Sequence, residues 1–148
     1  MIQVTHMFPA ASRRLVLIGD DRPLTEAASL LGDTARHMVV VCDRVGAMTG
    51  VVTRTDIVRQ IQHCQGCACT TPCIDVMTRA VISCCPEDLL HEVWAIMKDK
   101  SLTAVPIVDV ERKPIGLVVA RDALEMLLSE AEHEEELLKG YVNCVGYH

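Results

Sequence analysis

Two short segments of the chain place a glycine, apolar residues and an aspartate at the same spacing. They are Gly50-Val-Val-Thr-Arg-Thr-Asp56 and Gly116-Leu-Val-Val-Ala-Arg-Asp122. Each is expected at the junction of a strand and a helix, where the first N–H groups of the helix lack partners and attract phosphate. The Thr53 hydroxyl could donate to a phosphate oxygen, and the Asp56 carboxylate could accept from two ribose hydroxyls. The first segment therefore predicts a grip for a nucleoside phosphate.

The same spacing also fits a structural role. In a capping box, a threonine caps the start of a helix and an acidic residue three positions later bonds back to it. Thr53 and Asp56 satisfy that pattern. In the second segment Val119 replaces the threonine and cannot cap, yet Asp122 is kept. This difference favours ligand binding and predicts two unequal sites, of which the one with Val119 binds phosphate less well or stays empty.

The two segments belong to a longer tandem repeat. An offset of 66 positions maps Leu15–Val58 onto Val81–Leu124 without gaps. The copies are about 60 residues long, and units of that size are marginally stable alone, so we expect them to share a core. Duplicated proteins usually keep their functional site in the cleft between the copies.

Four cysteines lie close together between the copies, beside His63. They are Cys64, Cys67, Cys69 and Cys73. Thiolate clusters of this kind bind zinc or hold an iron–sulfur centre. The spacing is not diagnostic of either, because structural zinc sites generally join two separated cysteine pairs. Reduced linker thiols without a function are the alternative.

Composition argues against several classes of function. The chain has 148 residues, and its 20 acidic residues exceed its 14 basic ones by six. That excess equals the glutamates between positions 125 and 136, and no basic stripe or aromatic platform exists for nucleic acid. No apolar run approaches the roughly 20 residues that span a bilayer, and the N-terminus does not resemble a signal peptide. Eight cysteines then predict a reducing cytoplasm.

Hydrophobic patterns predict the order β-α-β-β-α in both copies. Helices are expected after Pro23 and Pro86, because proline is tolerated in a first helical turn. The last helix should begin near Ala120 and continue to about Lys139, where Gly140 ends it. The expected strands are Leu15–Ile18, Met38–Cys42, Met48–Val52, Val81–Cys84, Val105–Val108 and Ile115–Val119.

With these features the chain resembles a pair of cystathionine-β-synthase (CBS) domains. The resemblance rests on the two Gly-to-Asp segments, the strand Thr103–Asp109, the lead-in Val76–Arg79 and the element order, and it covers residues 10–130. It implies an α/β fold in which two β-α-β-β-α repeats pack by their sheets about a pseudo-twofold axis, usually paired further into a disc-shaped homodimer. It also implies two related clefts for adenine nucleotides or other adenosyl ligands, in a regulatory sensor and not a catalyst.

The resemblance assigns roles to individual residues. Asp56 and Asp122 would hold ribose, and Thr53 would touch phosphate. Arg54 and Arg121 could supply charge to phosphates, or they are solvated arginines at helix starts. The adenine pockets would be lined by Ile82, Ser83, His37, Met38, Val39, Thr103, Ala104, Val105 and Pro106.

The sequence therefore predicts a cytoplasmic, homodimeric regulatory module that is not an enzyme. It would bind an AMP, ADP, ATP or S-adenosylmethionine type of ligand between its repeats and signal occupancy to a partner protein, without nucleic acid or membrane. The alternatives are a metal-binding or redox-responsive protein using Cys64–Cys73, or a structural interaction module using the acidic helix. The predicted organisation is an N-terminal segment 1–13, repeat 14–63, cysteine-rich linker 64–78, repeat 79–130, and acidic helix end with tail 131–148.

Overall fold

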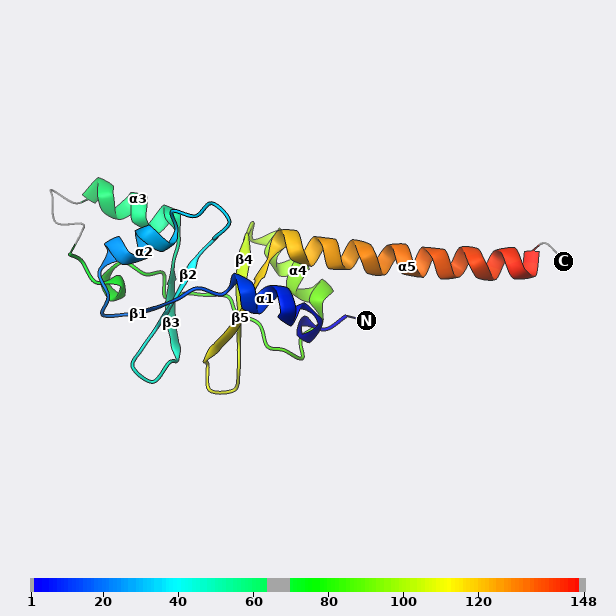
Figure 1. The fold of residues 1–148 in the computed structure, drawn as a ribbon, viewed down its shortest axis with the longest axis horizontal. Helices are drawn as coiled ribbons and strands as arrows, with labels where there is room; N and C mark the ends of the chain where they lie inside the picture. The colour runs from blue at the N-terminus through cyan, green and yellow to red at the C-terminus, as the bar shows by residue number, and fades with distance from the viewer. Residues whose placement is uncertain (1, 64–69, 147–148) are drawn as a thin grey trace.

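The computed structural model describes residues 2–63 and 70–146 and contains two sheets beside each other (Figure 1). In the first sheet, the central strand β2 pairs in parallel with β1 and antiparallel with β3. In the second sheet, β4 pairs antiparallel with β5. The strands are β1 (Leu17–Gly19), β2 (Val39–Cys42), β3 (Met48–Val52), β4 (Ala104–Val108) and β5 (Pro114–Val119). The predicted mixed α/β fold with two repeats is confirmed.

Each sheet carries its own helices. The helices α2 (Leu24–Leu30) and α3 (Arg54–His63) belong to the first repeat, and α4 (Leu90–Asp99) and α5 (Ala120–Gly146) to the second. Pro23 is the N-cap residue of α2, in agreement with the expected helix start. Three further elements were not expected from the hydrophobic pattern: the 3-10 helices η1 (Val4–Met7) and η2 (Cys73–Asp75), and helix α1 (Phe8–Arg14).

The 66-residue offset recurs in the pairing of the strands. Ile18 pairs with Val41 in the first repeat, and Cys84 pairs with Ile107 at the equivalent place in the second. The register shifts after Val41 and after Ile107, which are again equivalent positions. The two copies therefore share strand register as well as element order.

One predicted strand is reduced to a single bridge. Val81–Cys84 was expected to form a strand, but only Cys84 pairs, with Ile107. In the first repeat Val40 donates its N–H to the carbonyl of Val16 at 2.8 Å. The residue equivalent to Val40 is Pro106, which has no N–H to donate, so the corresponding ladder bond is missing.

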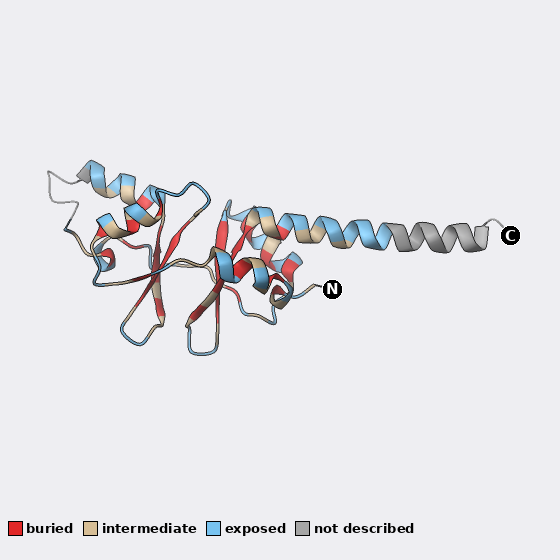
Figure 2. Cartoon of the chain, viewed as in Figure 1, coloured by how far each residue is buried: buried red, intermediate tan, exposed pale blue. Residues whose placement is uncertain are grey.

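Side chains of the strands are buried on both faces (Figure 2). On β2, Val39 and Val41 face the core of the first repeat, whereas Val40 and Cys42 face the other sheet. Alternation of this kind follows from the twofold period of a strand. The core shared by the two sheets contains Met38, Val40, Cys42, Met48, Val51, Ala104, Val108, Leu117 and Val119. The repeats thus pack by their sheets, as predicted.

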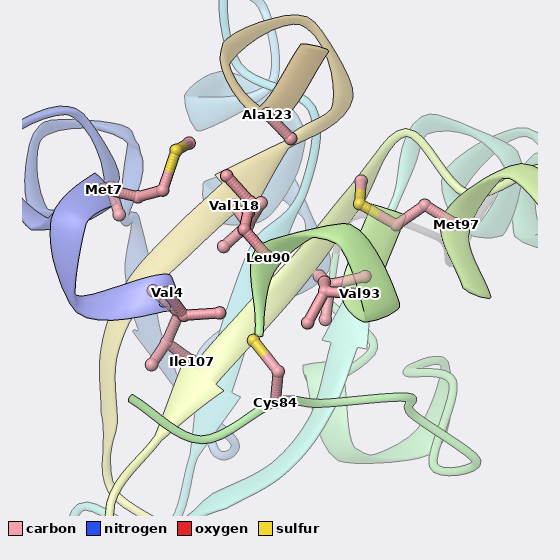
Figure 3. Close-up of a cluster of buried hydrophobic side chains, with 11 residues drawn as sticks. Val4, Met7, Cys84, Leu90, Val93, Met97, Ile107, Val118 and Ala123 are labelled. Atoms are coloured by element: carbon pink, nitrogen blue, oxygen red, sulfur yellow. The ribbon is translucent and has the colours of Figure 1, made fainter. Parts of the chain in front are cut away.

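The segment that precedes each repeat packs on the other repeat. Figure 3 shows Val4 and Met7, at the N-terminus, packed among Leu90, Val118 and Ala123 of the second repeat. The segment before the second repeat packs instead on the first, where Thr78 exchanges backbone hydrogen bonds with Val51 at 2.8 and 3.0 Å. Each repeat is therefore completed by the lead-in of the other.

The glycines of the repeated segments make this exchange possible. A Cβ on Gly50 would lie 2.7 Å from the carbonyl oxygen of Thr78, and one on Gly116 would lie 3.0 Å from the Cβ of Ala11. Ala11 and Met77 are related by the same offset of 66, so the two glycines accept equivalent lead-ins. The glycines that begin the motif are thus required by close packing.

Helix α5 is longer than expected. It continues through Gly140 to Gly146, and Figure 1 shows it extending away from the rest of the molecule. A glycine inside a helix costs only about 1 kcal/mol relative to alanine, which explains why Gly140 does not end it. Residues 131–135 on this helix are all exposed. Among the described residues, none of the helices is both long and apolar enough to cross a membrane.

Candidate functional site

A cavity lies where the two repeats meet. It encloses about 170 Å³, and we call it the first cleft. Five of its lining residues were predicted from the sequence: Met38, Thr53, Ile82, Ala104 and Pro106. The remaining lining residues are Val51, Thr78, Ala80, Val81 and Leu102, which the sequence analysis did not single out. The walls come from both repeats and are largely apolar.

The other predicted pocket residues lie outside this lining. Val39 and Val105 are buried in the separate cores of the two repeats, because they alternate with residues that face the shared core. His37 and Ser83 are half-buried and Thr103 is exposed, and each is a neighbour in sequence of a lining residue. The structure thus brings Met38 and Ile82 from two of the predicted runs, and Ala104 and Pro106 from the third, into the cavity.

Ile82 offers unpaired backbone groups at this cavity. Within the described part of the chain, neither its N–H nor its carbonyl makes a hydrogen bond. In the first repeat the equivalent carbonyl, that of Val16, accepts from the N–H of Val40. Pro106 stands in the place of Val40 and has no N–H, so the carbonyl of Ile82 lacks this donor. Pro106 also lines the cavity. A backbone N–H and C=O side by side form a donor–acceptor pair for the edge of a heterocyclic base.

Asp56 lies beneath the first cleft and is only 4% exposed. The backbone N–H of Thr53 donates to its Oδ2 at 2.9 Å, and the Thr53 hydroxyl donates to the same oxygen at 3.2 Å. The Thr78 hydroxyl donates to Oδ1 at 2.9 Å, and an Arg59 nitrogen lies 3.6 Å from that oxygen. This is the capping arrangement that the spacing allowed. Thr53 and Thr78, which both bond Asp56, also line the cleft.

A second cavity of about 240 Å³ occupies the equivalent place in the other half of the molecule, and we call it the second cleft. Four of its lining residues, Arg14, Leu15, Val16 and Arg36, precede Ala80, Val81, Ile82 and Leu102 of the first cleft by 66 positions. Its other lining residues are Arg13, Asp33 and Ala35. None of these seven was predicted as a site residue; two of them, Arg14 and Arg36, differ in type from their counterparts Ala80 and Leu102.

Asp122, the counterpart of Asp56, already has a partner. Arg14 donates from Nε to Oδ2 at 3.0 Å and from Nη2 to Oδ1 at 3.1 Å. These hydrogen bonds, together with the charge of Asp122, raise the pKa of Arg14 above its ordinary value. Val119, which stands in the place of Thr53, is buried in the shared core. The second repeat therefore lacks the hydroxyl, and both oxygens of Asp122 are already bound by Arg14.

The two predicted phosphate arginines have other partners. Arg54 donates from Nη2 to the carbonyls of Leu31 and Asp33, at 2.9 and 3.0 Å. Arg121 is exposed and lies 3.4 Å from Glu125. A phosphate would have to compete with these contacts.

Of the predicted metal ligands, Cys64, Cys67 and Cys69 lie outside the described residues. Cys73 is described, and it is fully buried in the core of the first repeat. Burial raises the pKa of its thiol, so the thiolate that metals require is disfavoured there. Residues 2–62 and 70–135, whose side chains the structure describes, contain no group of three or more side chains arranged to hold a metal ion.

The architecture agrees with comparisons to known proteins. The family model of the CBS domain matches residues 7–63 and 73–129. The chain therefore belongs to the CBS domain family and carries two copies of the domain.

Relatives extend well beyond this chain. An uncharacterized protein of Methanocaldococcus jannaschii is 27% identical over 108 residues, which make up 73% of this chain and 25% of that protein. The chain spans a quarter or less of the length of the first curated relatives that it matches.

Solved structures share the fold at low sequence identity. The CBS domain pair of protein MJ0100, in complex with 5′-methylthioadenosine and S-adenosyl-L-methionine, has a TM-score of 0.72 at 22% identity, covering 88% of this chain and 98% of that one. CBSX2 in complex with AMP has a TM-score of 0.76 at 17% identity, covering 88% and 99%.

Proposed function

We propose that this chain is a regulatory module that binds an adenosine-containing ligand in the first cleft and signals its occupancy to a partner protein. The observation that carries the proposal is the unpaired N–H and carbonyl of Ile82 at an apolar cavity. Apolar walls suit the faces of adenine, and the two backbone groups suit its hydrogen-bonding edge. Two solved CBS domain pairs with this fold hold AMP or S-adenosyl-L-methionine with 5′-methylthioadenosine, which supports the ligand class.

The ribose and phosphate would extend toward Thr53 and Asp56. Ligand pockets commonly measure roughly 300–1,000 Å³, whereas the first cleft encloses about 170 Å³. The cavity therefore accommodates the base, and the rest of the ligand lies toward the start of α3. Ribose hydroxyls would replace the Thr78 hydroxyl on Asp56, so hydrogen bonds to the ligand would take the place of one hydrogen bond within the protein.

This exchange gives a route for signalling. Thr78 belongs to the segment that joins the repeats, and it leaves its present partner when ribose binds. The ligand would also contact Met38 of one repeat and Ile82 of the other, so it favours one relative orientation of the two. Binding would then shift the population of module conformations, which a partner could detect.

We further propose that the module acts as a homodimer in the cytoplasm. Val58 on α3 and Leu124 on α5 are equivalent by the repeat and both exposed, and Ile61 and Leu128 on the same helices are also exposed. A second copy would cover apolar side chains on both repeats at once. Sedimentation velocity on wild type and on Val58→Glu tests this, since a dimer through these helices dissociates in the variant.

Calorimetric titration of the reduced, metal-free protein with AMP, ADP, ATP and S-adenosylmethionine tests the ligand class. We expect binding by wild type and a loss of roughly tenfold or more in affinity in Asp56→Asn, because the carboxylate that accepts from ribose is removed. Asp21→Asn, which changes an exposed aspartate in the turn before α2, is the matched control and should bind as wild type does. Thermal unfolding of each variant verifies that it is folded.

A second pair of variants locates the site. Asp122→Asn leaves the first cleft intact, so binding should be weakened in Asp56→Asn alone. Ala80→Trp fills the apolar cavity and should abolish binding without touching the carboxylate. An absence of binding by all four ligands to wild type, or equal binding by Ala80→Trp, contradicts the proposal.

A further inference from the structure

A groove lies between the N-terminal segment and the start of α5, on the second repeat. Its volume is about 360 Å³, which exceeds that of either cleft. Its apolar residues are Met7 of η1, Pro9 and Ala10 of α1, and Met126 of α5. It shares Arg13 with the second cleft, but its other lining residues belong to η1, α1 and α5 and to neither cleft.

The apolar part of the groove is built from residues that adapt to a partner. Met7 is buried and Met126 is half-buried, and both line the groove. Methionine is unbranched and polarizable, and it is common on surfaces that bind apolar side chains of different shapes. Amphipathic helices bind grooves of this kind through apolar residues spaced three or four positions apart. The groove therefore fits the apolar face of a helix.

Acidic residues continue from the groove along α5. Glu130 follows Met126 by four residues, and Glu132 follows Ser129 by three, so each lies one helical turn beyond a residue that lines the groove. Neither glutamate makes a hydrogen bond or an ion pair with any residue in the described part of the chain. The outer end of the groove therefore presents two carboxylates that a cationic partner can pair with.

This part of α5 is not covered by the rest of the molecule. Residues 131–135 are exposed, and Figure 2 shows the helix extending beyond both sheets. Five glutamates lie between positions 130 and 136. Like charges three or four positions apart repel within a helix, and most helices depend on tertiary packing of one face. A cationic partner alongside α5 would relieve the repulsion and supply that packing.

The residues that form this surface differ in the first repeat. By the offset of 66, the counterparts of Glu125 and Met126 are Arg59 and Gln60. A cation and an amide thus stand where the second repeat has a carboxylate and a thioether. The counterpart of α5 is α3, which ends at His63. The groove and its acidic continuation are therefore specific to the second repeat and do not follow from the duplication.

The groove also lies apart from the proposed dimer contact. Leu124 and Leu128 are separated from Met126 and Ser129 by about a third of a turn around the axis of α5. A second copy that covers the two leucines therefore leaves the groove open to another partner.

We propose that this groove, together with Glu130 and Glu132, is the docking site for an amphipathic helix of a partner protein. Apolar side chains of the partner fill the groove over Met7 and Met126. Its lysine or arginine residues lie at the outer end, beside the two glutamates and away from Arg13, which lines the groove near the start of α5. As a description of the regulated partner this inference rests on the proposed function, whereas the docking itself requires no adenosyl ligand.

Calorimetric titration with a synthetic amphipathic leucine–lysine peptide of about four helical turns tests the site. Wild type should bind this peptide without any adenosyl ligand, and it should not bind the same peptide with glutamate in place of lysine. Glu130→Gln/Glu132→Gln should lose affinity about fivefold, because two ion pairs at the protein surface are lost. Glu87→Gln/Glu92→Gln removes two exposed carboxylates elsewhere on the second repeat and is the charge-matched control with wild-type affinity.

Variants of the groove itself separate docking from general attraction between opposite charges. Ala10→Trp fills the groove without changing its charge and should lower the affinity for the peptide about tenfold or more. Ser129→Arg, at an exposed position, places a cation beside the lysines of the peptide and should also lower the affinity. Thermal unfolding verifies that each variant is folded, and Ser129→Arg decides the test if Ala10→Trp is not.

The proposal is overturned if wild type does not bind the leucine–lysine peptide, if the folded groove variants bind it as wild type does, or if the control variant loses as much affinity as Glu130→Gln/Glu132→Gln. Sedimentation velocity of Ser129→Arg should show the oligomeric state of wild type. Dissociation in this variant would show that a second copy occupies the groove, which also overturns the proposal. Peptide binding by a protein that binds no adenosyl ligand supports the docking site and contradicts only the proposed function.

Discussion

The two clefts occupy equivalent places in one duplicated fold, yet four positions make their chemistry different. By the offset of 66, Thr53, Ala80, Leu102 and Pro106 of the first cleft correspond to Val119, Arg14, Arg36 and Val40. Of these counterparts, Arg14 and Arg36 line the second cleft. The first set leaves an apolar cavity with free backbone groups, and the second gives a charged cavity whose backbone is paired. The chemical difference between the clefts thus comes from mismatches between the repeats, while the matched residues maintain the common fold.

The matched glycines Gly50 and Gly116 should show the largest difference in stability between the repeats. Gly50→Ala puts a Cβ 2.7 Å from a backbone oxygen of Thr78, whereas Gly116→Ala puts one 3.0 Å from a side-chain carbon of Ala11. Backbone in a paired segment moves less readily, so we expect Gly50→Ala to lower the free energy of unfolding by about 3 kcal/mol and Gly116→Ala by about 1 kcal/mol. Urea titration measures both. Equal losses would show that the two lead-ins are held with equal stiffness.

The second largest difference in stability is expected at the aspartates of the repeated segments, Asp56 and Asp122. Asp56→Ala removes a buried carboxylate and leaves the N–H of Thr53 without its acceptor, so we expect a loss of about 2 kcal/mol in the free energy of unfolding. Asp122→Ala should cost less than about 1 kcal/mol, because the Arg14 side chain is 34% exposed and water replaces its partner. Chemical denaturation of both variants at neutral pH measures the difference. A larger loss for Asp122→Ala would contradict the assignment of the tighter network to the first repeat.

A third difference lies in the cores of the repeats, where Cys84 corresponds to Ile18. Burial raises the pKa of Cys84 to about 12, from an ordinary value of 9.0. Above pH 9.0 the unfolded chain releases this proton and the folded chain retains it, so the contribution of Cys84 to stability falls as the pH rises toward 12. The loss is about 1.4 kcal/mol per pH unit.

Cys84→Val removes this titration. The difference in stability between wild type and Cys84→Val should therefore shift in favour of the variant between pH 9 and pH 11, measured by denaturation at each pH. Cys85→Ser, at an exposed neighbouring position, is the control and should follow wild type. Parallel curves for wild type and Cys84→Val would show that Cys84 titrates normally.

The sequence predicted those features of the fold that both copies of the repeat share. Hydrophobic periodicity gave the element order, and the offset of 66 indicated the shared core, because both copies keep the same apolar pattern. The family resemblance assigned ligand contacts to Thr53, Met38, Ile82, Ala104 and Pro106, and these five residues line one cavity.

Other features depend on contacts between distant segments. The packing of α1 against the second repeat and the pair of Arg14 with Asp122 join residues 108 positions apart, which no local pattern encodes. Thr78 was missed because its hydroxyl acts on Asp56 from the linker. Pro106 was assigned to an adenine pocket by the family resemblance alone. Its counterpart Val40 donates to the carbonyl of Val16. Because Pro106 has no N–H, the equivalent carbonyl of Ile82 is left unpaired.

The turns between paired strands offer the smallest test of the same comparison. Gly46 has φ of 95°, and its counterpart Arg112 has φ of 62°, a conformation that favours glycine. In both turns an aspartate, Asp43 or Asp109, accepts two backbone N–H groups. Arg112→Gly removes the strain of an L side chain but adds freedom to the unfolded chain, and we expect a net gain of about 0.5–1 kcal/mol in stability.

The reciprocal change, Gly46→Arg, should cost a similar amount, because it imposes on the first turn the strain that the second already bears. Thermal unfolding of the two variants beside wild type measures both effects. If the two turns are as equivalent as their aspartate hydrogen bonds indicate, the double variant Gly46→Arg/Arg112→Gly returns to wild-type stability. A double variant well below wild type would show that the second turn holds its arginine by contacts that the first turn cannot supply.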